Sequence, residues 1–416
     1  MHAPIVRLPY QVFVIGAVVA AGLGSIAGSQ APGTATTLIL AHANVIDGRS
    51  NAPRQDVSLV IADGKIAAVR PAAAPMPAGA TVIDLSGAWV MPGFIDAHVH
   101  FDAIGAARMA LLTGATTVRT MNTFHFLDLE IRAAHRRGDE TLPDVIAAGY
   151  QIRPDMFPEF FEDFPALSDM NGRISGAKNV RRAVQAMASR GVDHIKVLAT
   201  ERAGTPETDP RKRTFSDEEI NALVDEAHRF NLPVAAHAHG DEGARAAVLA
   251  GVRSLEHGTW VSSATFEAMK ARRTFFVPTL SGGRQPPARP QDRDNPKLAE
   301  FRRVSIPFRI ELVRRAEAEG LPLAAGTDLR YTTADLSIAD EAIFLQQAGL
   351  SPMRVLQVMT VGSATCLGIQ NRTGALTPGL EADLVVLGAS PLADLGALKD
   401  IRMIVNDGKI AFRRRD

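Results

Sequence analysis

Short apolar runs that alternate with helical patterns predict an α/β fold: a (β/α)8 TIM barrel with a small β-sandwich domain. Eight runs are candidate barrel strands, one ending at His100 and the others at 116–121, 144–150, 194–199, 233–239, 254–258, 275–280 and 323–329. Eight strand–helix units over about 280 residues are what a closed parallel barrel needs. A doubly wound open sheet is the competing architecture, but no G-x-G-x-x-G phrase follows a strand.

Two helices between these runs have recognisable ends. Ser216 and Glu219 form a capping box, and apolar residues follow at helical spacing from Ile220. Another helix is expected over about 242–250, because Gly251 supplies a typical C-terminal stop.

Strand-like segments also occur at both ends of the chain. An Asp-Gly turn inside 60–66 predicts a hairpin, and the same phrase returns at 404–410. We therefore expect a composite β-sandwich from residues 36–90 and 373–413, flanking a barrel over 91–372.

The first 30 residues differ from the rest. Arg7 precedes an apolar run at 12–23, and small residues follow at 24–29. This pattern predicts a signal peptide over residues 1–27, cleaved near Ala27, and export to the periplasm or the medium. An uncleaved anchor is the alternative, although the run is short for a membrane span. We expect the mature protein not to be embedded in a membrane.

Charge and cysteine content narrow the class of protein. Lys plus Arg and Asp plus Glu each number 45, so the formal net charge is zero, which argues against a nucleic-acid partner. The single cysteine, Cys366, excludes an intramolecular disulfide and a cysteine-built zinc site. A bound metal would therefore need nitrogen and oxygen ligands.

Unusual polar residues stand where the predicted strands end, and this is where barrel enzymes place their chemistry. Five of the 11 histidines fall there, which core packing explains poorly. These strand-end residues are His98, His100, His237, His239, His257 and Asp328. His98 and His100 share one face of their strand and can bind one metal ion, or they can be hydrogen-bonded core histidines.

Lys196 lies inside an apolar strand, and a buried ammonium without a partner is costly. It is either ion-paired or, in the functional interpretation, an amine that reacts with CO2. The resulting carbamate would be an anionic ligand that bridges two cations.

Together these residues resemble the metal-binding pattern of the amidohydrolase superfamily. The pattern consists of His98, His100, Lys196, His237, His257 and Asp328, within the phrases at 92–96, 256–258 and 326–328. The resemblance covers about 36–413. It is strongest to the imidazolonepropionase-like branch, and within it to binuclear Xaa-Pro and Xaa-Arg/Lys dipeptidases and ochratoxin-cleaving amidases.

The resemblance implies two divalent cations, with Zn²⁺ expected. His98, His100 and Asp328 would hold one cation, and His237 and His257 the other. Carboxylated Lys196 and a hydroxide would bridge them. The resemblance favours His237, because it precedes His257 by 20 residues, the spacing expected in this branch; His239 as the ligand is the alternative.

The implied reaction is hydrolysis of an amide or peptide bond in a small substrate, a dipeptide or an N-acyl amino acid. The bridging hydroxide would attack, and Asp328 would act as the general base. Hydrolysis of a cyclic amide or lactone, or deamination, remains open at the same site. A homo-oligomer is compatible with the resemblance.

Four residues are candidates for substrate contact. Tyr150 is expected to end the third strand, and Tyr150 and His239 can bind an oxyanion or a substrate carboxylate. Arg153 and Arg330 follow strand ends and can pair with a C-terminal carboxylate, or they are solvated loop charges.

Three further assignments stay open. Residues 155–164, acidic and aromatic, form either a lid or a helix that packs its phenylalanines on the barrel. Residues 281–298 are expected to be a long mobile loop. Glu256 either supports a metal ligand or faces a helix.

Overall fold

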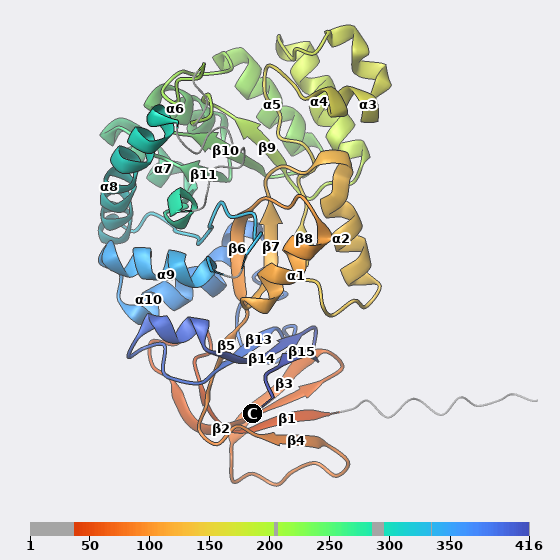
Figure 1. Ribbon diagram of the computed structural model, residues 1–416, viewed down its shortest axis with the longest axis vertical. Coiled ribbons are helices and arrows are strands. Elements are labelled where there is room, and N and C mark those ends of the chain that lie inside the picture. The colour runs from red at the N-terminus through yellow and green to blue at the C-terminus, as the bar shows by residue number, and fades with distance from the viewer. Residues whose placement is uncertain (1–36, 204–206, 285–294, 334, 416) are drawn as a thin grey trace, which may run out of the picture. The chain divides into compact units, whose positions relative to one another are not determined.

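The computed structural model describes residues 37–203, 207–284, 295–333 and 335–415 (Figure 1). The expected signal peptide lies outside these residues. Among the described helices, none has both the length and the apolar character needed to cross a bilayer.

Parallel strands form the centre of the barrel, as the sequence predicts. They pair in the orders β6-β7-β8 and β9-β10-β11-β12. Their bounds are β6 (Phe94–Val99), β7 (Ala115–Thr120), β8 (Asp144–Ile146), β9 (Ile195–Leu198), β10 (Val234–Ala238), β11 (Ser254–His257) and β12 (Phe275–Val277).

Isolated parallel bridges close these two sheets into one barrel. Ile152 pairs with Val197 and so joins the segment after β8 to β9. Residues 323–329 lie between β12 and β6, through the bridges Phe276–Leu323 and Val99–Leu329. The eighth strand is thus in its predicted place but lacks a regular ladder, since the backbone of Asp328 is left-handed, with φ 61°.

Helices follow the strands and lie on the outside of the barrel (Figure 1). They are α1 (Ile104–Leu112), α2 (Leu127–Arg136), α4 (Ala177–Ser189), α5 (Asp217–Arg229), α6 (Asp241–Ala250), α7 (Ser263–Arg272), α8 (Pro296–Glu319), α9 (Ile338–Gln347), α10 (Pro352–Gln357) and α11 (Ser363–Leu367). The predicted capping box of Ser216 and Glu219 begins α5, and α6 ends at Gly251, so both helix predictions are confirmed.

The terminal segments share one sheet with the strand order β15-β14-β13-β5-β1-β2-β3, and β4 pairs with β1. The strands are β1 (Leu38–Val45), β2 (Arg54–Ala62), β3 (Lys65–Pro71), β4 (Thr81–Asp84), β5 (Trp89–Pro92), β13 (Leu384–Leu387), β14 (Ile401–Asn406) and β15 (Lys409–Arg413).

This sheet packs on itself around a core of its own, which is the arrangement expected of the β-sandwich. Leu40 and Leu59 from the N-terminal strands belong to one apolar cluster with Leu384 and Met403 from the C-terminal strands. Both predicted Asp-Gly turns have the positive φ angles that their hairpins need.

The structure also bears on two of the open assignments. Residues Pro158–Asp163 form the short helix α3, which buries Phe160 against the rings of Tyr150 and Phe164, as the packed-helix alternative predicts. Of the predicted loop over 281–298, residues 285–294 lie outside the described part of the chain, while Ser281–Arg284 form a 3-10 turn and Asn295 caps α8.

Candidate active site

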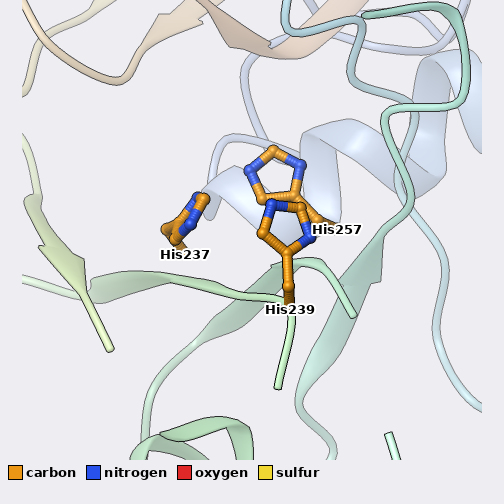
Figure 2. A group of neighbouring side chains, drawn as sticks. All are labelled: His237, His239 and His257. Carbon is orange, nitrogen blue, oxygen red and sulfur yellow. The ribbon is translucent and has the colours of Figure 1, made fainter. Parts of the chain in front are cut away.

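Three histidines converge at the ends of β10 and β11 (Figure 2). His237 and His239 follow one another on the same face of the β10 segment, and their ring centroids are 4.7 Å apart. The His257 ring lies 4.7 Å from His237 and 4.8 Å from His239. Each ring offers one nitrogen to a group of atoms within 4.8 Å of one another, a spacing compatible with a shared metal ion.

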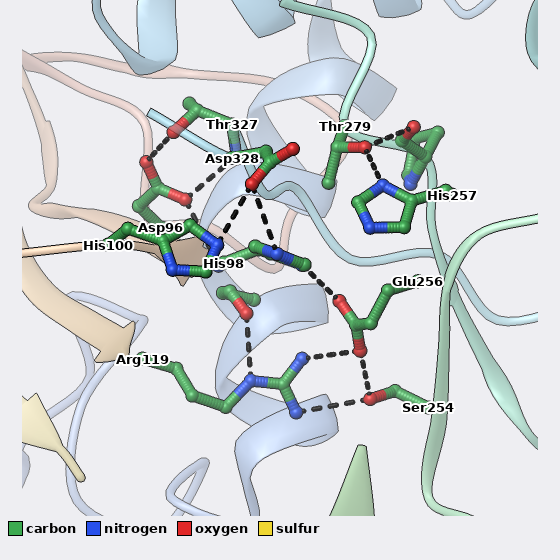
Figure 3. A network of polar contacts seen from close by, with 12 residues as sticks. Asp96, His98, His100, Arg119, Ser254, Glu256, His257, Thr279, Thr327 and Asp328 are labelled. Atoms are coloured by element: carbon green, nitrogen blue, oxygen red, sulfur yellow. Dashed lines mark hydrogen bonds and ion pairs between the residues drawn. The ribbon is translucent and has the colours of Figure 1, made fainter. Parts of the chain in front are cut away.

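A second group forms around Asp328 (Figure 3). The Oδ1 atom of Asp328 lies 3.0 Å from His100 Nε2 and 3.4 Å from His98 Nε2. Burial alone would raise the pKa of Asp328, but its contacts with His100 and His98 hold that pKa well below its ordinary value. His257 also lies within reach of His98 and Asp328, so it joins the two groups.

Lys196 is buried on β9, next to β10. Its Nζ atom makes no hydrogen bond within the described part of the chain. Burial lowers the pKa of this amine to about 8, which favours its neutral, nucleophilic form. The ordinary ion-paired alternative therefore lacks a direct contact.

Beneath the histidines, Glu256 anchors His98. Its carboxylate lies 2.7 Å from His98 Nδ1 and accepts hydrogen bonds from Arg119 Nη2 at 3.0 Å and Ser254 Oγ at 2.5 Å (Figure 3). Burial favours the neutral acid, yet Arg119 and His98 hold the pKa of Glu256 at about 2. His98 therefore donates through Nδ1 and keeps Nε2 for a ligand, so Glu256 supports His98 rather than facing a helix.

Asp96 is a second buried anchor, which the sequence did not single out. It accepts hydrogen bonds from Thr327 N at 3.0 Å, Thr327 Oγ1 at 2.6 Å and the Tyr331 hydroxyl at 2.7 Å. These contacts fix the eighth segment, and with it Asp328, beside β6. The close approach also requires Gly326, where a Cβ atom would lie 2.8 Å from the Cβ of His98.

Tyr150 does not end the third strand, and this prediction is wrong. The strand β8 ends at Ile146 because the chain leaves the ladder before Tyr150. The Tyr150 hydroxyl donates to Asp163 Oδ2 at 2.5 Å and accepts from the His125 amide at 3.0 Å. These contacts tie it to α3, and its role toward a substrate remains a prediction.

The two candidate arginines already have partners within the chain. Arg153 stacks on the Phe157 ring at 5.0 Å, and Arg330 Nη1 pairs with Asp102 Oδ2 at 2.5 Å. Each would have to share or exchange these contacts to bind a carboxylate. Their roles as substrate ligands also remain predictions.

His239 faces an aromatic group that the sequence analysis missed. Its ring lies 4.8 Å from Phe301 and 6.4 Å from Trp260, and Arg211 stacks on Trp260 at 3.8 Å. No local pattern signals this group, because its members come from α8 and from two separate loops.

A third cluster that could hold a metal consists of Glu381, Asp383 and Asp407 in the β-sheet region. Its carboxylates have partners in the protein: Glu381 pairs with Arg372, and Asp383 accepts from Thr373. It contains no histidine, and we place no active site there.

Glu381 offers a test of stability. Burial raises its pKa to about 7, so the folded state holds this proton more tightly than the unfolded chain, and ionisation between about pH 4 and 7 destabilises the fold. We expect Glu381→Gln to raise the melting temperature relative to wild type more at pH 8 than at pH 5. Thermal unfolding at both pH values checks this, and an equal difference at each would contradict it.

Comparison with known proteins identifies the class. The Amidohydrolase family model matches residues 89–411, and the chain belongs to this family of hydrolytic enzymes. It is 26% identical to an ochratoxinase from Aspergillus niger over 368 residues, which cover 76% of this chain and 74% of the relative.

Solved structures of related enzymes have the same fold. A Xaa-Pro dipeptidase with bound methionine superposes with a TM-score of 0.80 at 25% identity, over 90% of this chain and 99% of that one. A putative prolidase from Bifidobacterium longum gives a TM-score of 0.78 at 28% identity, over 92% of this chain and 97% of that one. The barrel fold and the suspected branch of the family are thereby confirmed.

Proposed function

We propose that this protein is a metal-dependent hydrolase that cleaves the amide bond of a dipeptide or N-acyl amino acid. Family membership makes it a hydrolytic enzyme of amide bonds. The metal dependence rests on one observation: the side chains of His98, His100, Lys196, His237, His257 and Asp328 gather in the barrel. The imidazoles and the carboxylate of this set are donors that suit Zn²⁺.

The residues present fit two cations. His98, His100 and Asp328 would hold one, and His237 and His257 the other. The buried amine of Lys196, which has no hydrogen-bond partner in the described chain, fits the bridging position once it carries CO2. The carbamate would replace a costly buried group with an anion held between cations.

When bound, the cations would lower the pKa of a water molecule and polarise the scissile carbonyl. The chain supplies the proton acceptor. Asp328 is held ionised by His98 and His100, so its carboxylate can take a proton from the attacking water and pass it to the leaving amine.

Aromatic neighbours favour His239 as the substrate contact and leave His237 as the ligand. Each ring has one nitrogen already engaged: His237 Nε2 lies 3.4 Å from the Glu201 carbonyl oxygen, and His239 Nδ1 lies 2.8 Å from Thr259 Oγ1. His239 also packs against Phe301 and Trp260, where a substrate side chain can reach it. We assign substrate contact to His239.

A pair of variants tests this assignment. His237→Asn is expected to lower metal content and activity together. His239→Asn is expected to keep the metal and lower kcat by about 10²-fold, because only an oxyanion or substrate contact is lost. Metal analysis and steady-state kinetics on both variants provide the check. Loss of metal in His239→Asn alone would reverse the assignment.

The substrate class follows from the family branch and is part of the proposal. Tyr150, Arg153 and Arg330 are the candidate ligands for a substrate carboxylate. The expected signal peptide would place the enzyme outside the cytoplasm, where hydrolysis of small peptides suits nutrient uptake.

A substrate panel tests the function. Dipeptides and N-acyl amino acids, assayed with Zn²⁺ and bicarbonate, are expected to be hydrolysed. Cyclic amides, lactones and aminopurines belong in the same panel. Turnover confined to those compounds would overturn the dipeptide proposal and favour the alternative chemistry.

A further inference from the structure

We propose that Arg309 and Glu341, two buried charged residues away from the ligand set, are positioning residues for His257. They act through the loop Pro278–Thr279–Leu280–Ser281, which follows β12. This inference rests on the proposed metal site.

Arg309 of α8 is buried, with only 4% of its surface exposed, and it binds the first half of this loop. Its Nη1 atom donates to the carbonyl oxygens of Pro278 at 3.2 Å and Thr279 at 2.9 Å. Nη1 also lies 3.2 Å from Thr279 Oγ1, and Nη2 donates to Ser305 Oγ at 3.0 Å. Nη1 is thus committed to the loop, and Ser305 holds the other end of the guanidinium.

Glu341 of α9 binds the second half of the loop. Its carboxylate accepts from the amides of Leu280 at 2.9 Å and Ser281 at 2.7 Å, and from Ser281 Oγ at 2.7 Å. Arg309 therefore donates to two loop carbonyls, and the Glu341 carboxyl group accepts from the next two amides. The two side chains together satisfy four consecutive backbone groups of the loop, so removal of either leaves buried backbone atoms without a partner.

The loop held in this way presents Thr279 to His257 (Figure 3). The Thr279 hydroxyl donates to the Pro278 carbonyl oxygen at 2.8 Å, so its oxygen acts as an acceptor toward His257 Nδ1 at 2.7 Å. This arrangement places the ring proton of His257 on Nδ1. The lone pair on Nε2 then faces the histidine group, as a metal ligand requires.

The backbone of Thr279 explains why this loop needs two buried anchors. Its φ angle of 51° is left-handed, a conformation that is strained for a β-branched residue. The contacts from Arg309 and Glu341 offset that strain. Without them, we expect the loop to relax and Thr279 to leave His257.

The experiment measures metal affinity and the tautomer of His257 separately. Thr279→Val removes the hydroxyl with little change of shape, and Thr279→Ser restores it. Arg309→Met removes the anchor, while Arg309→Lys keeps the charge with fewer donors. Thr360→Val, which deletes a buried hydroxyl bonded to the Leu356 carbonyl, is the matched control.

We expect Thr279→Val and Arg309→Met to weaken Zn²⁺ binding about 10–100-fold, measured by chelator competition. Thr279→Ser should bind as wild type does, Arg309→Lys should be intermediate, and Thr360→Val should change only thermal stability. In the metal-free protein labelled with ¹⁵N-histidine, the Nδ1–H signal of His257 should be present in wild type and lost in Thr279→Val.

Two outcomes separate the inference from the function on which it rests. Unchanged Zn²⁺ affinity and an unchanged His257 signal in Thr279→Val would overturn the positioning role. The other outcome is a wild-type protein that binds no Zn²⁺ but shows the Nδ1–H signal of His257, together with loss of that signal in Thr279→Val. That result would overturn the proposed metal site and support the positioning of His257.

Discussion

Replacing Lys196 with alanine is expected to remove bound metal and amide hydrolysis together. The side chain is buried on β9, and its Nζ atom has no hydrogen-bond partner in the described chain. If its carbamate bridges two cations, alanine removes an anionic ligand from both. The loss of several kcal/mol of transition-state stabilisation corresponds to a fall in kcat/KM on the order of 10³-fold.

Metal analysis and kinetics on the same preparation measure this effect. Lys270→Ala, at an exposed ion pair with Glu319, is the matched control and should retain both properties. A short-chain carboxylic acid added to Lys196→Ala should restore part of the activity, because it can occupy the vacated bridging position. Retention of metal and hydrolysis in Lys196→Ala would contradict the bridging role.

Replacing Asp328 with asparagine is expected to lower kcat by about 10²–10⁴-fold, the range typical of a lost general base. Asparagine has the same shape but cannot accept the proton. It also weakens the contacts with His98 and His100, which lie 3.4 and 3.0 Å from Asp328 Oδ1, so metal content should fall as well.

Kinetics on metal-saturated Asp328→Asn separate the two effects. The matched control is Asp225→Asn, which changes an exposed carboxylate on α5. Full kcat at saturating metal in Asp328→Asn would show that another group takes the proton.

Local sequence patterns predicted most of the fold. The capping box at Ser216, the stop at Gly251 and the two Asp-Gly turns are local signals, and each forms as expected. The irregular form of the eighth strand was harder to predict, because closure of the barrel at this strand depends on Asp96 binding Thr327, 231 residues away along the chain. The helix α3 could not be chosen over a lid, because phenylalanines at its spacing suit both.

The candidate site was also predicted in part. Its histidines and Asp328 could be predicted because they stand at strand ends, where barrel enzymes place their functional residues. The residues that support them could not be predicted, because they bind partners far away along the chain: Arg119 binds Glu256 across 137 positions, and Glu341 binds Ser281 across 60. Only the three-dimensional structure brings such pairs together. Arg119 is the one support with a sequence signal, because it is a charged residue inside an apolar strand and so needs a buried partner.

We expect amide hydrolysis to depend on two cations held in the barrel. The most direct test is metal content and dipeptide hydrolysis, measured on one preparation before chelation, after it, and after reloading with Zn²⁺ and bicarbonate. We predict about two divalent cations per chain, loss of activity on chelation and recovery on reloading. Less than one cation per chain, with hydrolysis unaffected by chelation, would contradict the account.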